Sequence, residues 1–175
     1  ETATLVSTGT GSGKSECFLY PAISKALQLR DAGAPAGIST VIVYPMNALA
    51  EDQLGRLRDL LAGSGITFGM YVGKTPDAQH GVPLIMPEHS SRKEYQDKVK
   101  KYQEEKRSET VHPYEEVCSR EMMRTDGKQP RILLTNVKQL ELLLTRGIDA
   151  ELFKNATLDY LVFCLLYTSP SPRDG

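Results

Sequence analysis

The feature that most constrains the fold is a glycine-rich stretch near the start of the chain, Thr8-Gly9-Thr10-Gly11-Ser12-Gly13-Lys14-Ser15. An apolar, strand-like run at residues 3–7 leads into it, and an apolar, helix-like run at residues 16–29 follows it. Glycine permits backbone conformations that are closed to residues with a Cβ, so such a loop can turn its N–H groups inward around a polyphosphate. The order of strand, loop, Gly-Lys-Ser and helix is typical of a P-loop, although Thr8 stands where the first Gly is usual.

A P-loop assigns a role to each of its last residues. Lys14 would reach the β- and γ-phosphates of a bound nucleotide and is the candidate catalytic residue, and the Ser15 hydroxyl would bind Mg²⁺. The positive end of the following helix would face the same phosphates. The alternative is an ordinary glycine-rich turn, which the Lys-Ser ending disfavours. The predicted phosphate-binding residues are Thr10, Gly11, Ser12, Gly13, Lys14 and Ser15.

Length and charge exclude some classes of protein. The chain has 175 residues, enough for one domain with a core, and its net charge of -1 provides no general attraction for nucleic acid, so any such site must be local. Its three cysteines show no metal-ligand spacing and fit a reducing compartment. No stretch is long and apolar enough to span a membrane, and we expect a cytoplasmic protein. Because the chain opens inside a motif and lacks an initial Met, we expect an internal fragment.

Strands and helices are predicted to alternate along most of the chain. Buried strands are expected at residues 40–44, 66–70, 131–135 and 158–163, with helices after Asn47 and Asn136, each capped by that Asn, and a kink at Pro21 in the first helix. This alternation predicts an α/β fold with a parallel sheet covered by helices on both faces. The P-loop, Pro45 with Asn47, and Thr135 with Asn136 should then share the rim at the carboxyl ends of the strands, where ligands bind in such sheets.

Residues 77–130 are polar and contain no clear strand, which indicates an insertion. Residues 92–109 favour a solvated surface helix that gathers Tyr95, Val99 and Tyr102 on one face. A basic, tyrosine-bearing helix for nucleic acid is the alternative, which the mixture of charges disfavours. Three histidines of the insertion show no repeated spacing, so they are interpreted as surface residues rather than ligands: His80, His89 and His112.

The last residues, 164–175, differ from the rest because they show neither a helical nor a strand period. Codon by codon, they match the translation of a string that resembles a common transposase sequencing adapter. We therefore expect the genuine chain to end near Phe163 and the tail to be non-native; the alternative is a natural linker rich in Ser and Pro.

The chain from residue 2 to residue 163 resembles the superfamily-two helicases of the DEAD/DEAH-box type. Residues 7–21 resemble motif I, residues 44–53 motif Ia, residues 69–76 the following strand and glycine turn, and residues 132–141 motif Ib. The set is most similar to large bacterial helicases related to DNA repair and phage defence. The resemblance implies a RecA-like P-loop domain, incomplete here, that forms the first ATP-binding lobe of an ATP-dependent helicase or translocase.

The same resemblance implies a nucleic-acid partner, expected to be DNA, either as a single strand or as a duplex. Four residues fall where such helicases contact the sugar-phosphate backbone: Pro45, Asn47, Thr135 and Asn136. Small polar side chains and helix N-termini donate hydrogen bonds to phosphates, so the assignment is physically reasonable. The alternative is that the two asparagines serve only as helix caps.

The chain also departs from the family pattern. The acidic pair of motif II should follow Phe163, but Cys164 and Leu165 stand there, and the second lobe and the adenine-reading segment are missing. Because phosphoryl transfer needs those acids for Mg²⁺ and for the attacking water, we expect the chain as written to be inactive. The alternatives to a helicase lobe are another P-loop enzyme such as a small-molecule kinase, and a non-catalytic nucleic-acid-binding module.

Overall fold

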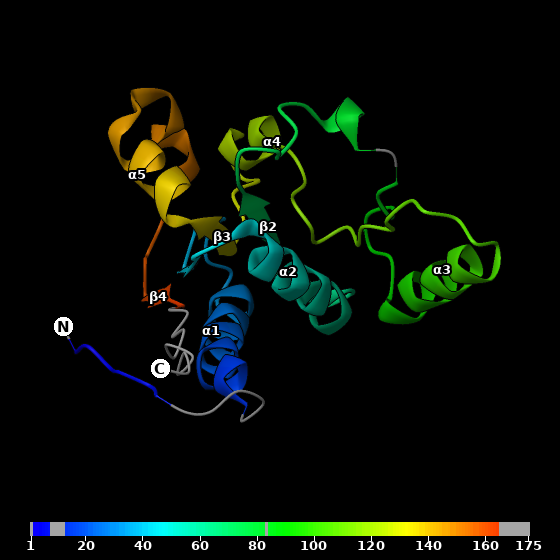
Figure 1. Cartoon of the computed structure of the whole chain (residues 1–175), viewed down its shortest axis with the longest axis horizontal. Helices are drawn as coiled ribbons and strands as arrows, with labels where there is room; N and C mark the ends of the chain where they lie inside the picture. The colour runs from blue at the N-terminus through cyan, green and yellow to red at the C-terminus, as the bar shows by residue number, and fades with distance from the viewer. Residues whose placement is uncertain (1, 8–12, 83, 165–175) are drawn as a thin grey trace, which may run out of the picture.

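A single parallel sheet organises the protein, whose computed structural model describes residues 2–7, 13–82 and 84–164 (Figure 1). Its strands lie in the order β2-β3-β1-β4, and every pair is parallel. The strands are β1 (Thr40–Tyr44), β2 (Phe68–Tyr71), β3 (Ile132–Asn136) and β4 (Tyr160–Phe163). The predicted α/β fold with a parallel sheet is confirmed, and the register places Val43 beside Thr135 and Tyr44 beside Asn136 at the carboxyl ends.

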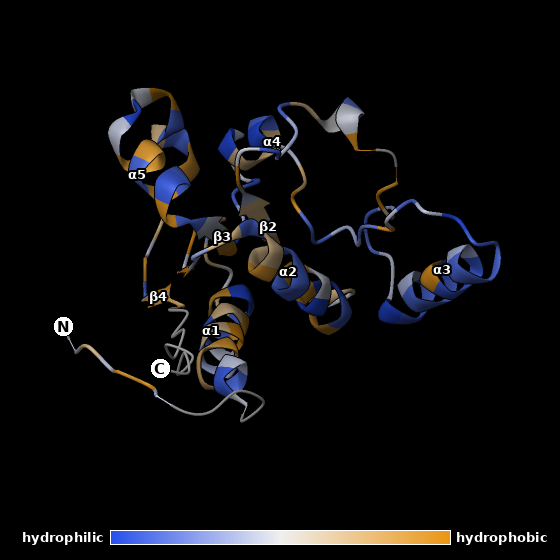
Figure 2. Ribbon diagram, viewed as in Figure 1, coloured by the Kyte–Doolittle hydropathy of each residue, from blue (hydrophilic) through white to orange (hydrophobic). Residues whose placement is uncertain are grey.

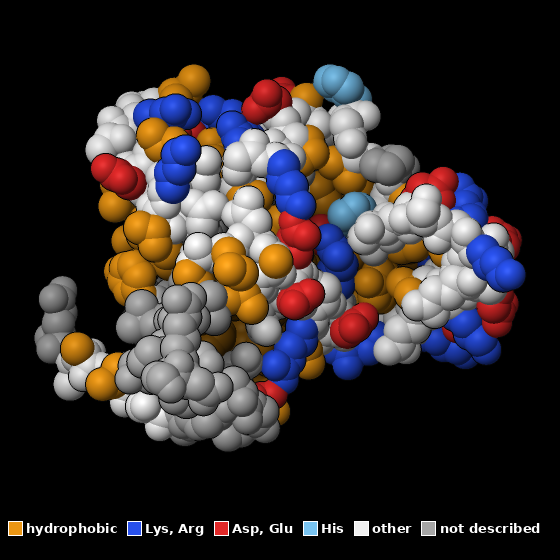
Figure 3. Space-filling model, viewed as in Figure 1, with side chains coloured by type: hydrophobic (Ala, Val, Ile, Leu, Met, Phe, Trp, Pro, Cys, Tyr) orange, Lys and Arg blue, Asp and Glu red, His pale blue; other side chains and the backbone are white. Residues whose placement is uncertain are grey.

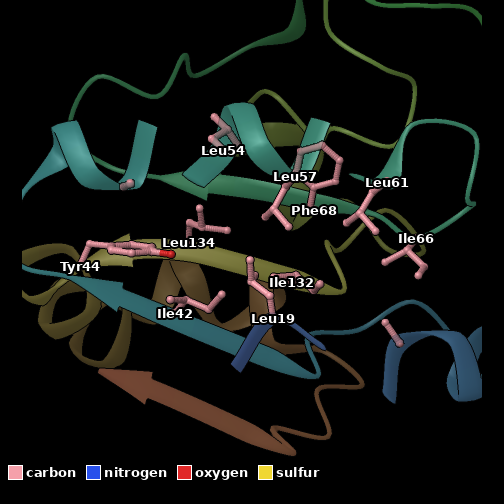
Figure 4. Close-up of a cluster of buried hydrophobic side chains, with 12 residues drawn as sticks. Leu19, Ile42, Tyr44, Leu54, Leu57, Leu61, Ile66, Phe68, Ile132 and Leu134 are labelled. Atoms are coloured by element: carbon pink, nitrogen blue, oxygen red, sulfur yellow. The ribbon is translucent and has the colours of Figure 1, made fainter. Parts of the chain in front are cut away.

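One face of the sheet is covered by α1 (Lys14–Asp31) and α2 (Asn47–Leu61). Apolar residues recur along both helices at helical spacing, so each buries one stripe against the alternate residues of the strands. Pro21 lies within α1. Figure 4 shows the resulting cluster, whose central members are Leu19, Ile42, Tyr44, Leu54, Leu57, Leu61, Ile66, Phe68, Ile132 and Leu134.

The opposite face of the sheet is covered by shorter elements: α4 (Arg120–Arg124), α5 (Val137–Thr145) and the 3₁₀ segment η2 (Gly147–Phe153). Its core is a second cluster, built on Ile38, Val41, Val43, Tyr71, Val117, Met123, Leu133, Leu143 and Leu152. The prediction that helices cover both faces is therefore confirmed. None of the helices in the described part of the chain is both long and apolar enough to cross a membrane.

The insertion contains η1 (Gln79–Gly81), α3 (Arg92–Glu104) and α4. A capping box starts α3: the Ser91 hydroxyl accepts from Glu94 N–H, and the Glu94 carboxylate accepts from Ser91 N–H. Tyr95 and Tyr102 are buried in a third cluster. The rest of α3 is polar in Figure 2, and Figure 3 shows acidic and basic side chains interspersed over this end of the molecule. The predicted surface helix with one tyrosine face is confirmed.

The structure contradicts the predictions for residues 3–7 and for His112. Residues 3–7 do not form a strand: they have no secondary structure, and Leu5 is 85% exposed. A strand requires a hydrogen-bonded partner, and this segment makes no backbone pairing with the described part of the sheet, so local β-propensity is not enough. His112, predicted to be a surface residue, has a side chain only 15% exposed because it packs beside Glu116.

Candidate nucleotide and nucleic-acid site

The start of α1 provides the first part of the candidate site. Gly13 is the N-cap, with φ 75° and ψ 24°, a left-handed conformation that favours glycine, which has no side chain to cap the helix. Lys14 is exposed and Ser15 half-buried in the first turn. The N-terminus of a long helix attracts an anionic group, so these residues fit a phosphate. The other predicted phosphate ligands, Thr10, Gly11 and Ser12, lie outside the described residues.

An ion pair between Glu16 and Arg56 lies beside this helix start and connects α1 to α2. The hydrogen bond from Arg56 is the largest cause that holds the pKa of the Glu16 carboxyl below its usual value. A carboxylate in the first turn would repel a phosphate, and the guanidinium offsets that charge. Arg56 is not predicted from its sequence position, because it lies on the polar side of α2 far from the P-loop in sequence. The signal available in the sequence is the acidic residue directly after Gly-Lys-Ser, which needs a compensating cation.

The carboxyl ends of β1 and β3 carry the second part of the site. Asn136 Nδ2 donates to Asn47 Oδ1 at 2.8 Å, and Asn136 Oδ1 accepts from Gln139 N–H at 2.8 Å. The first bond brings together residues from motifs Ia and Ib, as the predicted shared rim requires. The second confirms that Asn136 caps α5.

The predicted cap at Asn47 is wrong. Met46 is the N-cap of α2 and makes no side-chain cap bond, while Asn47 is the first residue of the helix. Its side chain is turned to Asn136 instead, because the register places the end of β3 directly beside the end of β1. Pro45 and Met46 are exposed next to it, so the segment between β1 and α2 forms an accessible part of the rim.

Thr135, the fourth predicted nucleic-acid residue, is fully buried. Its hydroxyl donates to the backbone carbonyl of Tyr71 at 2.7 Å and so connects β3 to β2. In this arrangement the side chain supports the rim from below, whereas Pro45, Asn47 and Asn136 line its surface.

Cys164 stands where the family resemblance predicts an acid that holds Mg²⁺. Its N–H donates to the Val43 carbonyl at 2.9 Å, so it continues the line of β4 beside β1. The thiol is half-buried, and burial raises its pKa to about 11. Mg²⁺ prefers carboxylate and phosphate oxygens, and a neutral thiol offers neither. The described residues therefore fit a phosphate but do not complete a Mg²⁺ site. Leu165 lies outside the described residues.

The protein has a parallel sheet, a helix with a glycine N-cap packed on it, and polar side chains at the carboxyl ends of the strands. Together these features define a nucleotide-binding α/β domain. A sequence profile of the DEAD/DEAH box helicases matches residues 1–163, and the chain belongs to this family, whose ATP-binding domain is a RecA-like P-loop fold. Members of the family use ATP and bind nucleic acid.

A curated relative, Druantia protein DruE from Escherichia coli (strain UMEA 4076-1), is 39% identical over 89 residues. The alignment covers 41% of this chain and 5% of the relative, so the chain spans only a small part of that protein. No solved structure matches the chain.

Proposed function

We propose that the chain is most of the first ATP-binding lobe of an ATP-driven nucleic-acid helicase or translocase in the bacterial cytoplasm. The observation that carries the proposal is the bond between Asn136 and Asn47, which joins the segments corresponding to motifs Ia and Ib at one rim. A small-molecule kinase has no need for two such polar segments held together at the sheet rim.

On this proposal Gly13, Lys14 and Ser15 bind the phosphates of ATP, with Lys14 on the transferring group. A nucleic-acid strand lies along Pro45, Asn47 and Asn136, where an exposed turn and helix N-termini can donate to phosphates. Contacts to the sugar-phosphate backbone carry no sequence information, so binding is largely independent of sequence. The resemblance to bacterial repair and defence helicases supports DNA as the strand.

We also propose that residues 164–175 are a non-native tail and that this chain does not hydrolyse ATP. With Cys164 and Leu165 in place of two carboxylates, no group completes the Mg²⁺ site or orients the attacking water. Catalysis requires the genuine continuation after Phe163 and the second lobe.

The test compares two versions of the protein: the 175-residue chain, and one in which Phe163 continues into the natural sequence through motif II and the second lobe. ATP hydrolysis is measured with and without a single strand. We expect hydrolysis, and its stimulation by the strand, only in the longer version. Hydrolysis that ignores nucleic acid would favour a kinase-like enzyme, and strand binding without hydrolysis in the longer version would favour a non-catalytic module.

A further inference from the structure

A compact group of metal-binding side chains lies in the insertion, away from the candidate nucleotide site. The Nδ1 atom of His112, a carboxylate oxygen of Glu116 and the Sγ atom of Cys118 all lie within 4.8 Å of one another. His112 Nδ1 is 2.6 Å from Glu116 Oε2, and Cys118 Sγ is 3.5 Å from the same oxygen. From this geometry we propose that His112, Glu116 and Cys118 bind one Zn²⁺ ion.

The ligand types match the metal. Zinc takes imidazole nitrogen, thiolate sulfur and carboxylate oxygen at about 2.0–2.3 Å in a tetrahedral arrangement. Ligand atoms around such an ion are then about 3.3–3.7 Å apart. The separation of Sγ from Oε2 already meets this requirement, and the imidazole must withdraw from the carboxylate by about 1 Å to admit the ion. The thiol proton is released to solvent as the Zn–S bond forms.

The backbone fixes each ligand independently. His112 N–H donates to the Leu84 carbonyl at 2.9 Å, and its own carbonyl accepts from Met86 N–H at 2.8 Å. Glu116 pairs with Phe68 at the start of β2, through Phe68 N–H to the Glu115 carbonyl and Val117 N–H to the Phe68 carbonyl. Cys118 directly precedes Ser119, the N-cap of α4. The site therefore needs little ordering when the ion binds.

The surroundings also suit a metal ligand. Arg58 from α2 bonds to both oxygens of Glu116, with Nη2 3.2 Å from Oε2. Ligating carboxylates are normally held by an outer partner in this way, which fixes their orientation. Glu116 and, once its proton is released, Cys118 each provide a negative charge for the ion, and Arg58 contributes the opposing positive charge. The fourth position is left for water.

The ion would fix the stretch at residues 112–118, which packs between another part of the insertion and the sheet. His112 lies beside the segment at residues 84–86 that belongs to the third core cluster, whereas Glu116 is paired to β2 and Arg58 belongs to α2. Zinc would thus hold together the stretch that contacts residues 84–86, β2 and α2, at a place separate from the candidate nucleotide site. This inference does not depend on the proposed function.

Cobalt provides a sensitive probe, since a Co²⁺ ion bound by thiolate shows a sulfur-to-metal charge-transfer band in the near ultraviolet. The experiment uses the full 175-residue chain carrying Cys17→Ser and Cys164→Ser, so that Cys118 is the remaining thiol of the three. We expect one Co²⁺ per chain, the charge-transfer band, and displacement of Co²⁺ by Zn²⁺. Absence of the band in this folded chain would overturn the proposal.

Two further substitutions identify the ligands, with far-ultraviolet circular dichroism to confirm folding. Cys118→Ser, which is nearly isosteric, should abolish the band. His112→Gln keeps a hydrogen-bond donor for Glu116 but lacks the imidazole, and it should weaken Zn²⁺ binding by more than the about 10–100-fold that losing an outer partner costs. A band that survives Cys118→Ser, or Zn²⁺ affinity unchanged by His112→Gln, would contradict the proposed site.

Discussion

Asn136 serves two partners at once: its Oδ1 accepts from Gln139 N–H and its Nδ2 donates to Asn47 Oδ1, both at 2.8 Å. One side chain therefore starts α5 and holds the beginning of α2. Because the two asparagines follow neighbouring strands, the orientation of both helix N-termini at the rim depends on this pair.

We expect Asn136→Ser to separate these two functions. Serine retains the N-cap but is too short to reach Asn47, so the loss in free energy of unfolding should be about 0.5–1.5 kcal/mol, the worth of one hydrogen bond. Asn136→Ala also loses the cap and should cost about 1 kcal/mol more. Urea denaturation measures both. Adding Asn47→Ala to Asn136→Ser should change stability little further; a full additional loss would show that the asparagines do not interact.

Thr135→Val should destabilise the fold by about 1–3 kcal/mol, because it removes the buried hydroxyl that donates to the Tyr71 carbonyl while keeping the side-chain shape. Thr145→Val is the matched control: that hydroxyl also donates to a carbonyl, of Glu141, but it is exposed, and its loss should stay within about 0.5 kcal/mol. Equal effects of the two substitutions in chemical denaturation would refute a special role for Thr135 beneath the rim.

Arg56→Gln should weaken nucleotide binding severalfold, since Glu16 would then present an uncompensated negative charge at the start of α1. The double variant with Glu16→Gln should recover the affinity, measured by titration of a fluorescent ATP analogue. If the double variant binds the ATP analogue as weakly as Arg56→Gln alone does, Arg56 does not act by neutralising the charge of Glu16.

The same ion pair has a pH signature. The folded state holds the pKa of Glu16 below its ordinary value of 4.5, so the pair stabilises the fold above that pH and the contribution is lost as pH falls through the folded pKa. In Arg56→Gln the pKa should rise toward 4.5. Carbon-detected NMR titration of the carboxyl groups reports this directly, and an unchanged pKa would contradict the assigned cause.

Lys14→Ala should reduce ATP hydrolysis by about 10²–10³-fold in the longer protein that includes motif II and the second lobe, because one preorganised charge on the transferring phosphate is lost. The fold should be unaffected, since Lys14 is exposed. Steady-state hydrolysis at equal folded fraction is the measurement. A decrease of only a few-fold would remove the support for the P-loop assignment.

Regular elements could be predicted from the sequence where hydrophobic period and caps agreed, as in the strand that became β1 and the helix after Asn136. Features that depend on residues distant in the sequence could not be predicted. Residues 3–7 have the composition of a strand but no pairing, and Asn47 has the chemistry of a cap but bonds across to Asn136. The pairs of Glu16 with Arg56 and of Glu116 with Arg58 join residues far apart in sequence, and neither partner's pattern alone indicates the other.

The strand order β2-β3-β1-β4 has a consequence for how the protein is made. β1 leaves the ribosome first, yet its neighbours in the sheet are β3 and β4, both of which are synthesised after the whole insertion. After β1 has been made, residues 45–131 must be synthesised before β3 can pair with it. Such non-local pairing slows folding. The helices α1 and α2 can cover only one face in the meantime, so the nascent chain needs protection from aggregation until β3 arrives. The pairing between the two central strands, β1 and β3, can therefore form only late in synthesis, and the edge strand β4 joins after it.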